Sequence, residues 1–384
     1  MQKKVEQMNK TSKLCWSNIL FLGGYHLLLL ILLPTYLFFY TPSGTLLLLS
    51  FILLYTTGLA ITAGYHRLFS HSTYKTNKFI ESIYLFFGSM ATQGSALRWS
   101  HDHRIHHAHI DKDEDPYTVK RGFWHAHFIW LFKKQNPIKE KVVADLVKDP
   151  ILAFQHKHFN ILMVVTNILA TLFIGWVTND YFGALVFGWL LRQFLLHHFT
   201  WFINSLAHYW GHQNYSTEHS AVDNYIISLL TFGEGYHNYH HTFAYDYRNG
   251  IRWYHFDPTK WLIWSLSKLG LARDLKRVSD TRIAEQMIKE HKRALLEKLQ
   301  ETFTEKREDL EEKVAYFTET LIEKLSKLNI LIQQYKSSKK LADKADYVKD
   351  LLGEISELKK SLRKEWRAWK DFSKFVMNLQ PALA

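Results

Sequence analysis

The histidines of this 384-residue chain fall into groups whose spacing suits metal binding. Two groups have the pattern His-x-x-His-His, at residues 103–107 and 237–241, and a third group pairs His66 with His71. On a helix, positions i, i+3 and i+4 share one face, so each pattern directs three imidazoles the same way. With His208, the candidate ligands are His66, His71, His103, His106, His107, His208, His237, His240 and His241.

Nine imidazoles are more than one ion takes, so we expect a site for two metal ions. Imidazole ligands suit zinc, copper, iron and nickel. Zinc sites usually stop at four ligands, and this excess therefore favours a redox-active pair. Asn204 precedes His208 by one helical turn and is a candidate for holding a water on the second ion.

Long apolar runs separate the histidine groups and predict membrane helices. Four runs cover residues 18–40, 45–64, 159–178 and 182–203, and each is about the ~20 residues that cross a bilayer core. Short connectors at 41–44 and 179–181 join them as two hairpins. We predict an all-α integral membrane protein with four transmembrane helices in two hairpins, under a helical cap formed by residues 65–158 and 204–279.

Basic residues predict the orientation of these helices. Neither connector contains Lys or Arg, whereas the segment 65–158 contains many. The positive-inside rule then places the cap and both termini in the cytoplasm, with all nine histidines on one side of the membrane. The net charge of +12 is explained by this basic cytoplasmic face, and we expect no nucleic-acid partner.

The residues after 279 differ in character from the membrane domain at 1–279. Apolar residues recur every three or four positions from Leu296 to Ile332 and from Val348 to Val376, with a polar break at 336–344. This pattern predicts that 280–384 is an amphipathic helical extension, either a two-helix hairpin or a coiled coil with a partner. We find no catalytic motif in it. The single cysteine, Cys15, excludes an intramolecular disulfide.

Taken together, these motifs resemble the membrane fatty acyl desaturases of the Δ9, stearoyl-CoA type. The resemblance runs along residues 15–279 and includes Asp-Glu-Asp-Pro at 113–116, Asn-Ser-Leu-Ala-His at 204–208 and Gly-Glu-Gly-Tyr-His-Asn-Tyr-His-His at 233–241. It implies an enzyme with two iron ions that uses O2 to introduce a cis-Δ9 double bond into palmitoyl-CoA or stearoyl-CoA. Removing hydrogen from an unactivated C–H bond needs an oxidant that side chains cannot supply.

The resemblance also implies a ligand set for each iron. One iron would take His66, His71, His103, His107 and His241, and the other would take His106, His208, His237 and His240, with Asn204 through a water. The residue spacing supports the whole set but not this division.

A bent apolar substrate tunnel is a further implication of the resemblance. Its bend would be lined by Gln93, Trp99 and Thr200, and its end would lie near Leu54 and Gly58. The residues that match the CoA-binding positions are Asn18, Asp102, Lys133, Lys134 and Trp201. This chain has His101 and Gly94 where the family usually has Arg and Asn, which leaves acyl carrier protein or an intact lipid as alternative acyl carriers.

The remaining expectations concern partners, location and rival functions. No motif of a fused electron carrier is visible, so we expect a separate donor of the ferredoxin or cytochrome b5 type. We favour a bacterial inner membrane, with the ER membrane as the alternative, and zinc as a possible replacement for iron after purification. The rival functions are a fatty-acid hydroxylase or alkane monooxygenase with the same diiron chemistry, and a non-catalytic metal-binding membrane protein. Transport of an ion would require ionisable residues in the spans, and Arg192, His197 and His198 are the residues that support it.

Overall fold

The computed structural model describes residues 13–301, 306–338 and 345–379. The chain divides into two units. The first unit comprises the residues up to 212 together with 219–277, and the second comprises 213–218 together with the residues from 278 onward.

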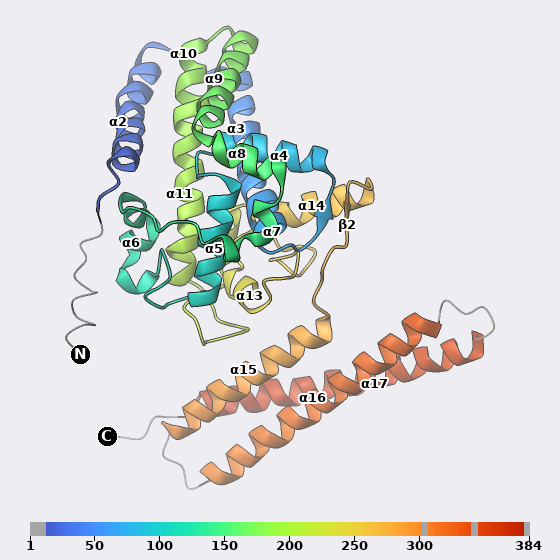
Figure 1. Ribbon diagram of the computed structural model, residues 1–384. Coiled ribbons are helices and arrows are strands. Elements are labelled where there is room, and N and C mark those ends of the chain that lie inside the picture. The colour runs from blue at the N-terminus through green and yellow to red at the C-terminus, as the bar shows by residue number, and fades with distance from the viewer. Residues whose placement is uncertain (1–12, 302–305, 339–344, 380–384) are drawn as a thin grey trace. The chain divides into compact units, whose positions relative to one another are not determined.

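Long apolar helices form one end of the first unit (Figure 1). They are α2 (Trp16–Phe39), α3 (Gly44–Leu59) and α9 (Phe159–Thr178). The helix α3 continues without a break into the π-helical segment η1 (Ala60–Ser70), so this run extends past the predicted end at residue 64. Within the described residues, three helices are long and apolar enough to cross a membrane: Trp16–Phe39, Gly44–Ser70 and Phe159–Thr178.

The fourth apolar run is also helical, but it is interrupted by a π-helical stretch and a buried charge. It consists of α10 (Tyr181–Gly183), η5 (Ala184–Leu191) and α11 (Arg192–Asn204). The Arg192 guanidinium donates hydrogen bonds to Gly188 O, Thr57 Oγ1 and Asn167 Oδ1. Because these partners come from the run itself and from two neighbouring helices, the buried charge is held by hydrogen bonds inside the unit.

Shorter elements make up the rest of the first unit. The helix α4 (Lys78–Met90), which is too short to span, packs against η1 and α9 and leaves Phe79 and Phe86 exposed. The strands β1 (Lys75–Thr76) and β2 (Ala272–Arg273) pair antiparallel. The remaining elements are α5 (Ala96–His109), η2 (Val119–Arg121), α6 (Phe123–His127), η3 (Ile129–Phe132), η4 (Glu140–Val142), α7 (Ala144–Val147), α8 (Pro150–Lys157), η6 (Leu206–His208), α12 (Tyr225–Leu230), α13 (His237–Thr242) and α14 (Pro258–Lys268).

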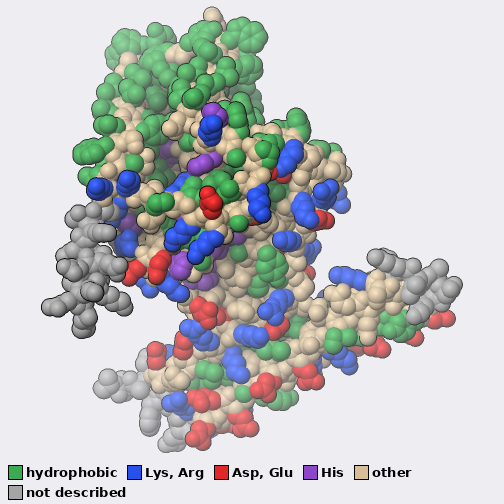
Figure 2. Space-filling model, viewed as in Figure 1, with side chains coloured by type: hydrophobic (Ala, Val, Ile, Leu, Met, Phe, Trp, Pro, Cys, Tyr) green, Lys and Arg blue, Asp and Glu red, His purple; other side chains and the backbone are tan. Residues whose placement is uncertain are grey.

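Side-chain chemistry differs between the two ends of this unit. On the face in Figure 2, hydrophobic side chains cover the end formed by α2, α9 and α10, whereas Lys, Arg and His side chains gather towards the other end. A buried apolar cluster joins η1 to α4, α5 and α11 through residues such as Ile61, Leu85, Leu97 and Leu196. This packing holds the helix that carries His66 against the helix that carries His103.

The second unit contains three helices in its described part, whereas the apolar pattern predicted two. They are α15 (Asp280–Gln300), α16 (Arg307–Ser338) and α17 (Ala345–Met377), packed around Leu295, Leu321 and Trp369. The prediction placed Leu296 and Leu299 in one helix with the residues that follow, but they belong to α15. The three-to-four spacing continues across the helix boundary, so periodicity alone did not reveal it. Residues 339–344 of the predicted polar break lie outside the described residues.

Candidate metal centre

The nine predicted histidines form two clusters in the structure. The first cluster contains His66, His71, His103, His107 and His240, and the second contains His106, His208, His237 and His241. In each cluster the candidate ligand atoms lie within 4.8 Å of one another. Four separate elements supply them, namely η1 with the residue after it, α5, η6 and α13.

The structure divides the nine histidines between the two clusters differently from the ligand sets that the resemblance implied, and this corrects that prediction. His240 belongs to the first cluster and His241 to the second, so the two residues exchange places. Helix geometry explains the exchange, because four residues advance about 40° beyond a full turn whereas three residues fall about 60° short of one. His237 and His241 therefore face more nearly the same way. The same rule pairs His103 with His107 and sends His106 to the other cluster.

The Nε2 atoms of the first cluster converge at short distances. His66 Nε2 lies 3.0 Å from His240 Nε2, and His240 Nε2 lies 3.0 Å from His107 Nε2. His71 Nε2 lies 2.8 Å from His103 Nε2. Nitrogen ligands at about 2.1 Å from an ion, at right angles to each other, would be about 3 Å apart. These distances therefore fit nitrogens that share a metal ion.

The second cluster converges in the same way. His241 Nε2 lies 3.0 Å from His237 Nε2 and 3.3 Å from His106 Nε2. The Nε2 atom of His208 is buried and has no hydrogen-bond partner within the described residues. A buried nitrogen lone pair without a partner is costly in a protein that binds nothing there, and so it fits a ligand to an ion.

The π-helical geometry of η1 brings His66 and His71 together. Their ring centroids lie 4.9 Å apart, and His71 N donates to His66 O, a bond that spans five residues. In a regular α-helix, positions five apart diverge by about 140°, so the wider turn is needed for both rings to face one ion. The sequence motif did not indicate this widening.

Acidic and hydroxyl groups contact the Nδ1 atoms of several cluster histidines. His66 Nδ1 lies 3.0 Å from Glu234 Oε2, His106 Nδ1 lies 2.9 Å from Asp115 Oδ1, and His103 Nδ1 lies 3.3 Å from Tyr117 Oη. A partner on Nδ1 holds the ring orientation and, when it accepts the Nδ1 proton, leaves the Nε2 lone pair for the metal. Of these partners, Glu234 and Asp115 lie within quoted sequence motifs, but their contacts with histidine became visible only in the structure.

Glu234 is itself held in a buried polar network. Its carboxylate accepts hydrogen bonds from Arg67 Nη2 at 2.8 Å and from Asn249 Nδ2 at 2.6 Å, and Arg67 also pairs with Asp257. Burial alone would raise the pKa of Glu234, but Arg67 and His66 hold that pKa below its usual value. Glu234 is therefore an anion that can orient His66.

The loop after His208 supports the second cluster. His208 Nδ1 lies 2.8 Å from Ser220 Oγ, which donates to Asp111 Oδ1 at 2.6 Å. Because Ser220 uses its own proton on Asp111, it accepts the Nδ1 proton of His208. Further along the loop, Asp223 Oδ1 accepts the backbone N–H of Tyr239 at the start of α13. Sequence reasoning identified neither Ser220 nor Asp223.

Burial keeps seven of the nine cluster histidines neutral. It lowers the pKa well below the usual value for His71, His103, His107, His208, His237, His240 and His241, and the neighbouring imidazoles lower it further. A metal ion binds the neutral imidazole, so these rings are in the protonation state that coordination requires.

A cavity of about 660 Å³ adjoins the first cluster. Its lining includes His66 and His103 of that cluster, and Trp99, whose ring stacks on His103 with centroids 4.8 Å apart. Gln93 and Thr200 also line it, and Gln93 Nε2 donates to Thr200 Oγ1 at 2.9 Å. The volume is within the range of about 300–1,000 Å³ typical of ligand pockets.

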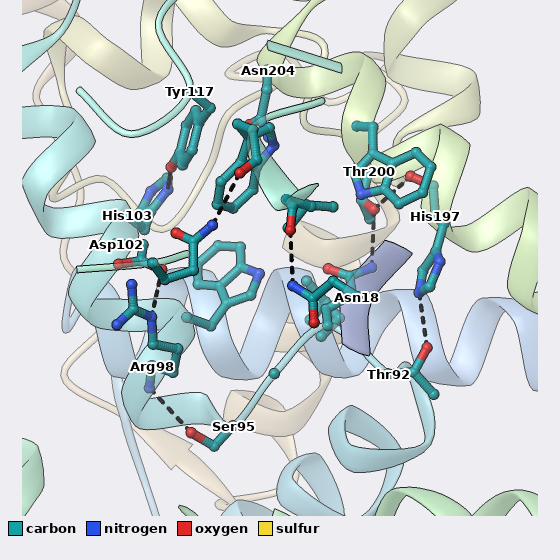
Figure 3. A pocket seen from close by; sticks show the side chains of 18 of the residues that line it. Asn18, Thr92, Ser95, Arg98, Asp102, His103, Tyr117, His197, Thr200 and Asn204 are labelled. Carbon is teal, nitrogen blue, oxygen red and sulfur yellow. Dashed lines mark hydrogen bonds and ion pairs between the residues drawn. The ribbon is translucent and has the colours of Figure 1, made fainter. Parts of the chain in front are cut away.

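The predicted carrier-binding residues are divided between the cavity and the surface. Asn18, Asp102 and Trp201 line the cavity, as does Asn204 (Figure 3). Asp102 accepts a hydrogen bond from Arg98 Nε at 2.8 Å. Lys133 and Lys134 are not among the lining residues; Lys133 is half-buried and Lys134 is exposed.

Leu54 and Gly58 are also absent from the cavity lining. The aromatic ring of Phe232 occupies the space beside Gly58, where an added Cβ would lie 2.4 Å from a ring carbon. Phe232 is 1% exposed and belongs to the same apolar core as Leu54. The structure therefore separates these two α3 residues from the three residues predicted at the bend.

Comparisons with known proteins agree with the histidine pattern. The family model described as fatty acid desaturase matches residues 42–274. "Acyl-CoA desaturase 1" of Saccharomyces cerevisiae is 43% identical over 245 residues, which are 63% of this chain and 48% of that protein. "Probable acyl-CoA desaturase" of Schizosaccharomyces pombe is 41% identical over 300 residues, 76% of this chain and 62% of that protein.

A bacterial relative is covered over most of its length. "sn-2 palmitoyl-lipid 9-desaturase" of Nostoc sp. is 33% identical over 273 residues, which are 70% of this chain and 92% of that protein. By contrast, the chain spans about half of the first yeast relative and less than two thirds of the second. The names of these relatives include both acyl-CoA and acyl-lipid substrates.

Proposed function

This chain belongs to the fatty acid desaturase family, and we propose that it is a membrane enzyme that uses O2 to introduce a cis-Δ9 double bond into palmitoyl-CoA or stearoyl-CoA. One observation carries the proposal: two clusters of buried and half-buried histidines have facing Nε2 atoms about 3 Å apart, and the first of them adjoins a cavity that is large enough for a ligand. The name of the Nostoc relative, a 9-desaturase, supports the Δ9 position.

We assign two iron ions to the two clusters. The donor set is imidazole, which suits iron and zinc alike, and nine such donors exceed what two structural zinc ions need. Bound iron would supply the oxidising power towards a C–H bond that protein side chains lack. Zinc would compete for the same nitrogens in purified protein. Asn204, at the cavity, is assigned to the second ion through a water.

The protein's own contribution is to place one pair of carbon atoms beside the clusters. Trp99 stacks on His103 where the cavity meets the first cluster, and a hydrogen bond joins Gln93 to Thr200 in the same lining. Holding a chain between these side chains fixes which carbons approach the metals, and such positioning is worth several kcal/mol of the barrier. We place the limit on chain length at Leu54 and Gly58, where Phe232 fills the space that a longer chain would need.

For the acyl carrier we propose CoA, held where the cavity is polar. Asn18, Asp102 and Trp201 line the cavity, and Lys133 and Lys134 would contribute positive charge for the phosphates. Acyl carrier protein and an intact lipid are the alternatives, and one relative is named for a lipid substrate. Competition between the three carriers for a purified enzyme would identify the preferred one.

For the membrane topology we propose four spans in two hairpins, with both termini in the cytoplasm. The fourth span would be the helical run from Tyr181 to Asn204, whose Arg192 has internal hydrogen-bond partners. We favour a bacterial inner membrane over the ER membrane. Electrons would come from a separate ferredoxin or cytochrome b5 type donor.

Product analysis tests the proposed reaction. The protein would be expressed in a host that lacks unsaturated fatty acids, with a His240→Ala variant as the matched control, and its lipids analysed by mass spectrometry. We expect a cis-Δ9 monoene from the wild type and none from the variant. A hydroxy acid would move the chain to the hydroxylases. No new product from the iron-loaded wild type, supplied with an electron donor, would instead favour a non-catalytic metal-binding role.

A further inference from the structure

The loop between His208 and α12 passes through both structural units. Residues 213–218 belong to the second unit, whereas His212 and His219, on either side of them, belong to the first. The base of the loop is closed by two backbone hydrogen bonds between His212 and Asp223, at 3.0 and 2.8 Å. The tip of a loop that supports the second histidine cluster is therefore part of the C-terminal unit.

Within the second unit, α15 holds this tip through a buried carboxylate. Glu290 Oε1 accepts the backbone N–H of Thr217 at 2.8 Å and also the Thr217 hydroxyl. Glu290 is 9% exposed. One turn earlier on the helix, Gln286 Nε2 donates to Tyr215 O at 2.8 Å. A buried carboxylate is costly unless its oxygens have donors, so the loop tip and Glu290 depend on each other.

The return limb of the loop carries the groups that orient the second cluster. Three residues after Thr217, Ser220 binds both His208 and the carboxylate of Asp111. Three residues further, Asp223 binds the first turn of α13, the helix of His237 and His241. Only two residues, Glu218 and His219, lie between Thr217, which contacts Glu290, and Ser220, which contacts His208. The two contacts are therefore closely linked along the chain.

We propose that Glu290 is a positioning residue for the second histidine cluster: by holding Thr217, it keeps Ser220 where it bonds to His208. The inference rests on the proposed function, because it takes the second cluster to be a metal site. It gives the C-terminal unit a role in the chemistry of the first unit through the covalent chain. Partners that orient metal-binding histidines typically change metal affinity by about 10–100-fold when they are lost.

Metal release from the purified full-length protein tests this role. The wild type, Glu290→Ala and Glu290→Gln would be loaded with iron and mixed with an excess of chelator, and the release of each ion followed in time. Glu297→Ala is the matched control, because Glu297 is an exposed carboxylate on the same helix that pairs with Arg293. The midpoint of thermal unfolding would be measured for every variant.

We expect Glu290→Ala to release one of its two ions about tenfold faster than the wild type, with the other ion unchanged. Glu290→Gln keeps an oxygen that accepts from Thr217, so its release should stay within about twofold of the wild type. Glu297→Ala should match the wild type. If Glu290→Ala does not fold, Thr217→Val provides a second test, because it removes only the hydroxyl contact with Glu290. This variant should still release the same ion faster than the wild type.

Four results would overturn the inference. If Glu290→Ala released both ions equally faster, or had a lower unfolding midpoint with unchanged metal release, Glu290 would support folding alone. A wild type that binds fewer than two ions would overturn the metal centre itself, and this inference with it. If every Glu290 and Thr217 variant bound two ions and released both at the wild-type rate, the inference would be refuted while the proposed function stayed intact.

Discussion

His240 and His241 are neighbours in the chain, yet their imidazoles belong to different histidine clusters. His240 Nε2 lies 3.0 Å from His66 Nε2 and from His107 Nε2, whereas His241 Nε2 lies 3.0 Å from His237 Nε2. The helix α13 thus contributes to both clusters. A single turn of helix links the two proposed ions, and each neighbour can be removed separately.

Replacement of His240 and replacement of His241 should therefore affect different ions. We expect His240→Ala to weaken the ion of the first cluster and His241→Ala the ion of the second, each variant keeping about one iron per chain. Both variants should lose product formation, because the proposed reaction requires both ions. Metal analysis combined with iron spectroscopy would check this, with the exposed His212→Ala as control. If both variants lost the same ion, the division into clusters would be wrong.

Glu234→Gln should weaken the first cluster selectively. The substitution keeps the shape of the side chain but removes the negative charge that contacts both His66 and Arg67. We expect metal at the first cluster to be bound about 10–100-fold more weakly, and the unfolding midpoint to fall because Arg67 loses one of its two buried carboxylates. Competition with a chelator measures the first effect. Glu140→Gln, at an exposed carboxylate, is the control, and an unchanged affinity in Glu234→Gln would contradict the assigned role.

Phe232 should set the longest acyl chain that the enzyme accepts. Phe232→Leu shortens the side chain beside Gly58, and we expect the products to shift from palmitoyl towards stearoyl or longer chains. Gly58→Ala should act oppositely and should cost about 1–3 kcal/mol of stability, since its Cβ overlaps the Phe232 ring. Mass spectrometry of products from mixed-chain substrates gives the ratio. The control is Phe187→Leu, another buried phenylalanine, and an unchanged ratio in both test variants would remove the chain-length role.

His125 should make the protein sensitive to acid. Burial lowers the pKa of His125 to about 4, and Lys133 and Arg121 contribute to this shift. Between the ordinary pKa of about 6.5 and this value, the unfolded chain binds more protons than the folded protein, so stability falls as the pH decreases through that window. His125→Gln should flatten this dependence. Thermal unfolding at several pH values between 7.5 and 4.5 would test it.

The control for this pH effect is His212→Gln, because His212 is exposed. Its unfolding midpoint should follow the wild-type pH dependence. An equal acid sensitivity in wild type and His125→Gln would mean that other groups cause the loss of stability.

Local sequence predicted the candidate ligands and the helices that carry them. Each His-x-x-His-His pattern predicts three imidazoles on one helix face, and both patterns lie on helices, α5 and α13. The apolar runs predicted the helices that became α2, α3 and α9, because length and hydropathy are properties of a continuous segment. The sequence could also have predicted which histidines share a cluster. A spacing of four residues, rather than three, pairs His103 with His107 and His237 with His241.

Only the tertiary structure decided which distant groups meet. No periodicity encodes the contacts between segments that are far apart in the chain or joined by an irregular loop. These contacts include Glu234 with His66, Ser220 with His208, and Phe232 with Gly58. The π-helical turn that aligns His66 with His71 likewise depends on packing around η1. The sequence by itself thus determined the donor chemistry, because residue type and helical spacing are local. The position of each donor around an ion was decided by packing, because a metal site needs side chains from several elements at once.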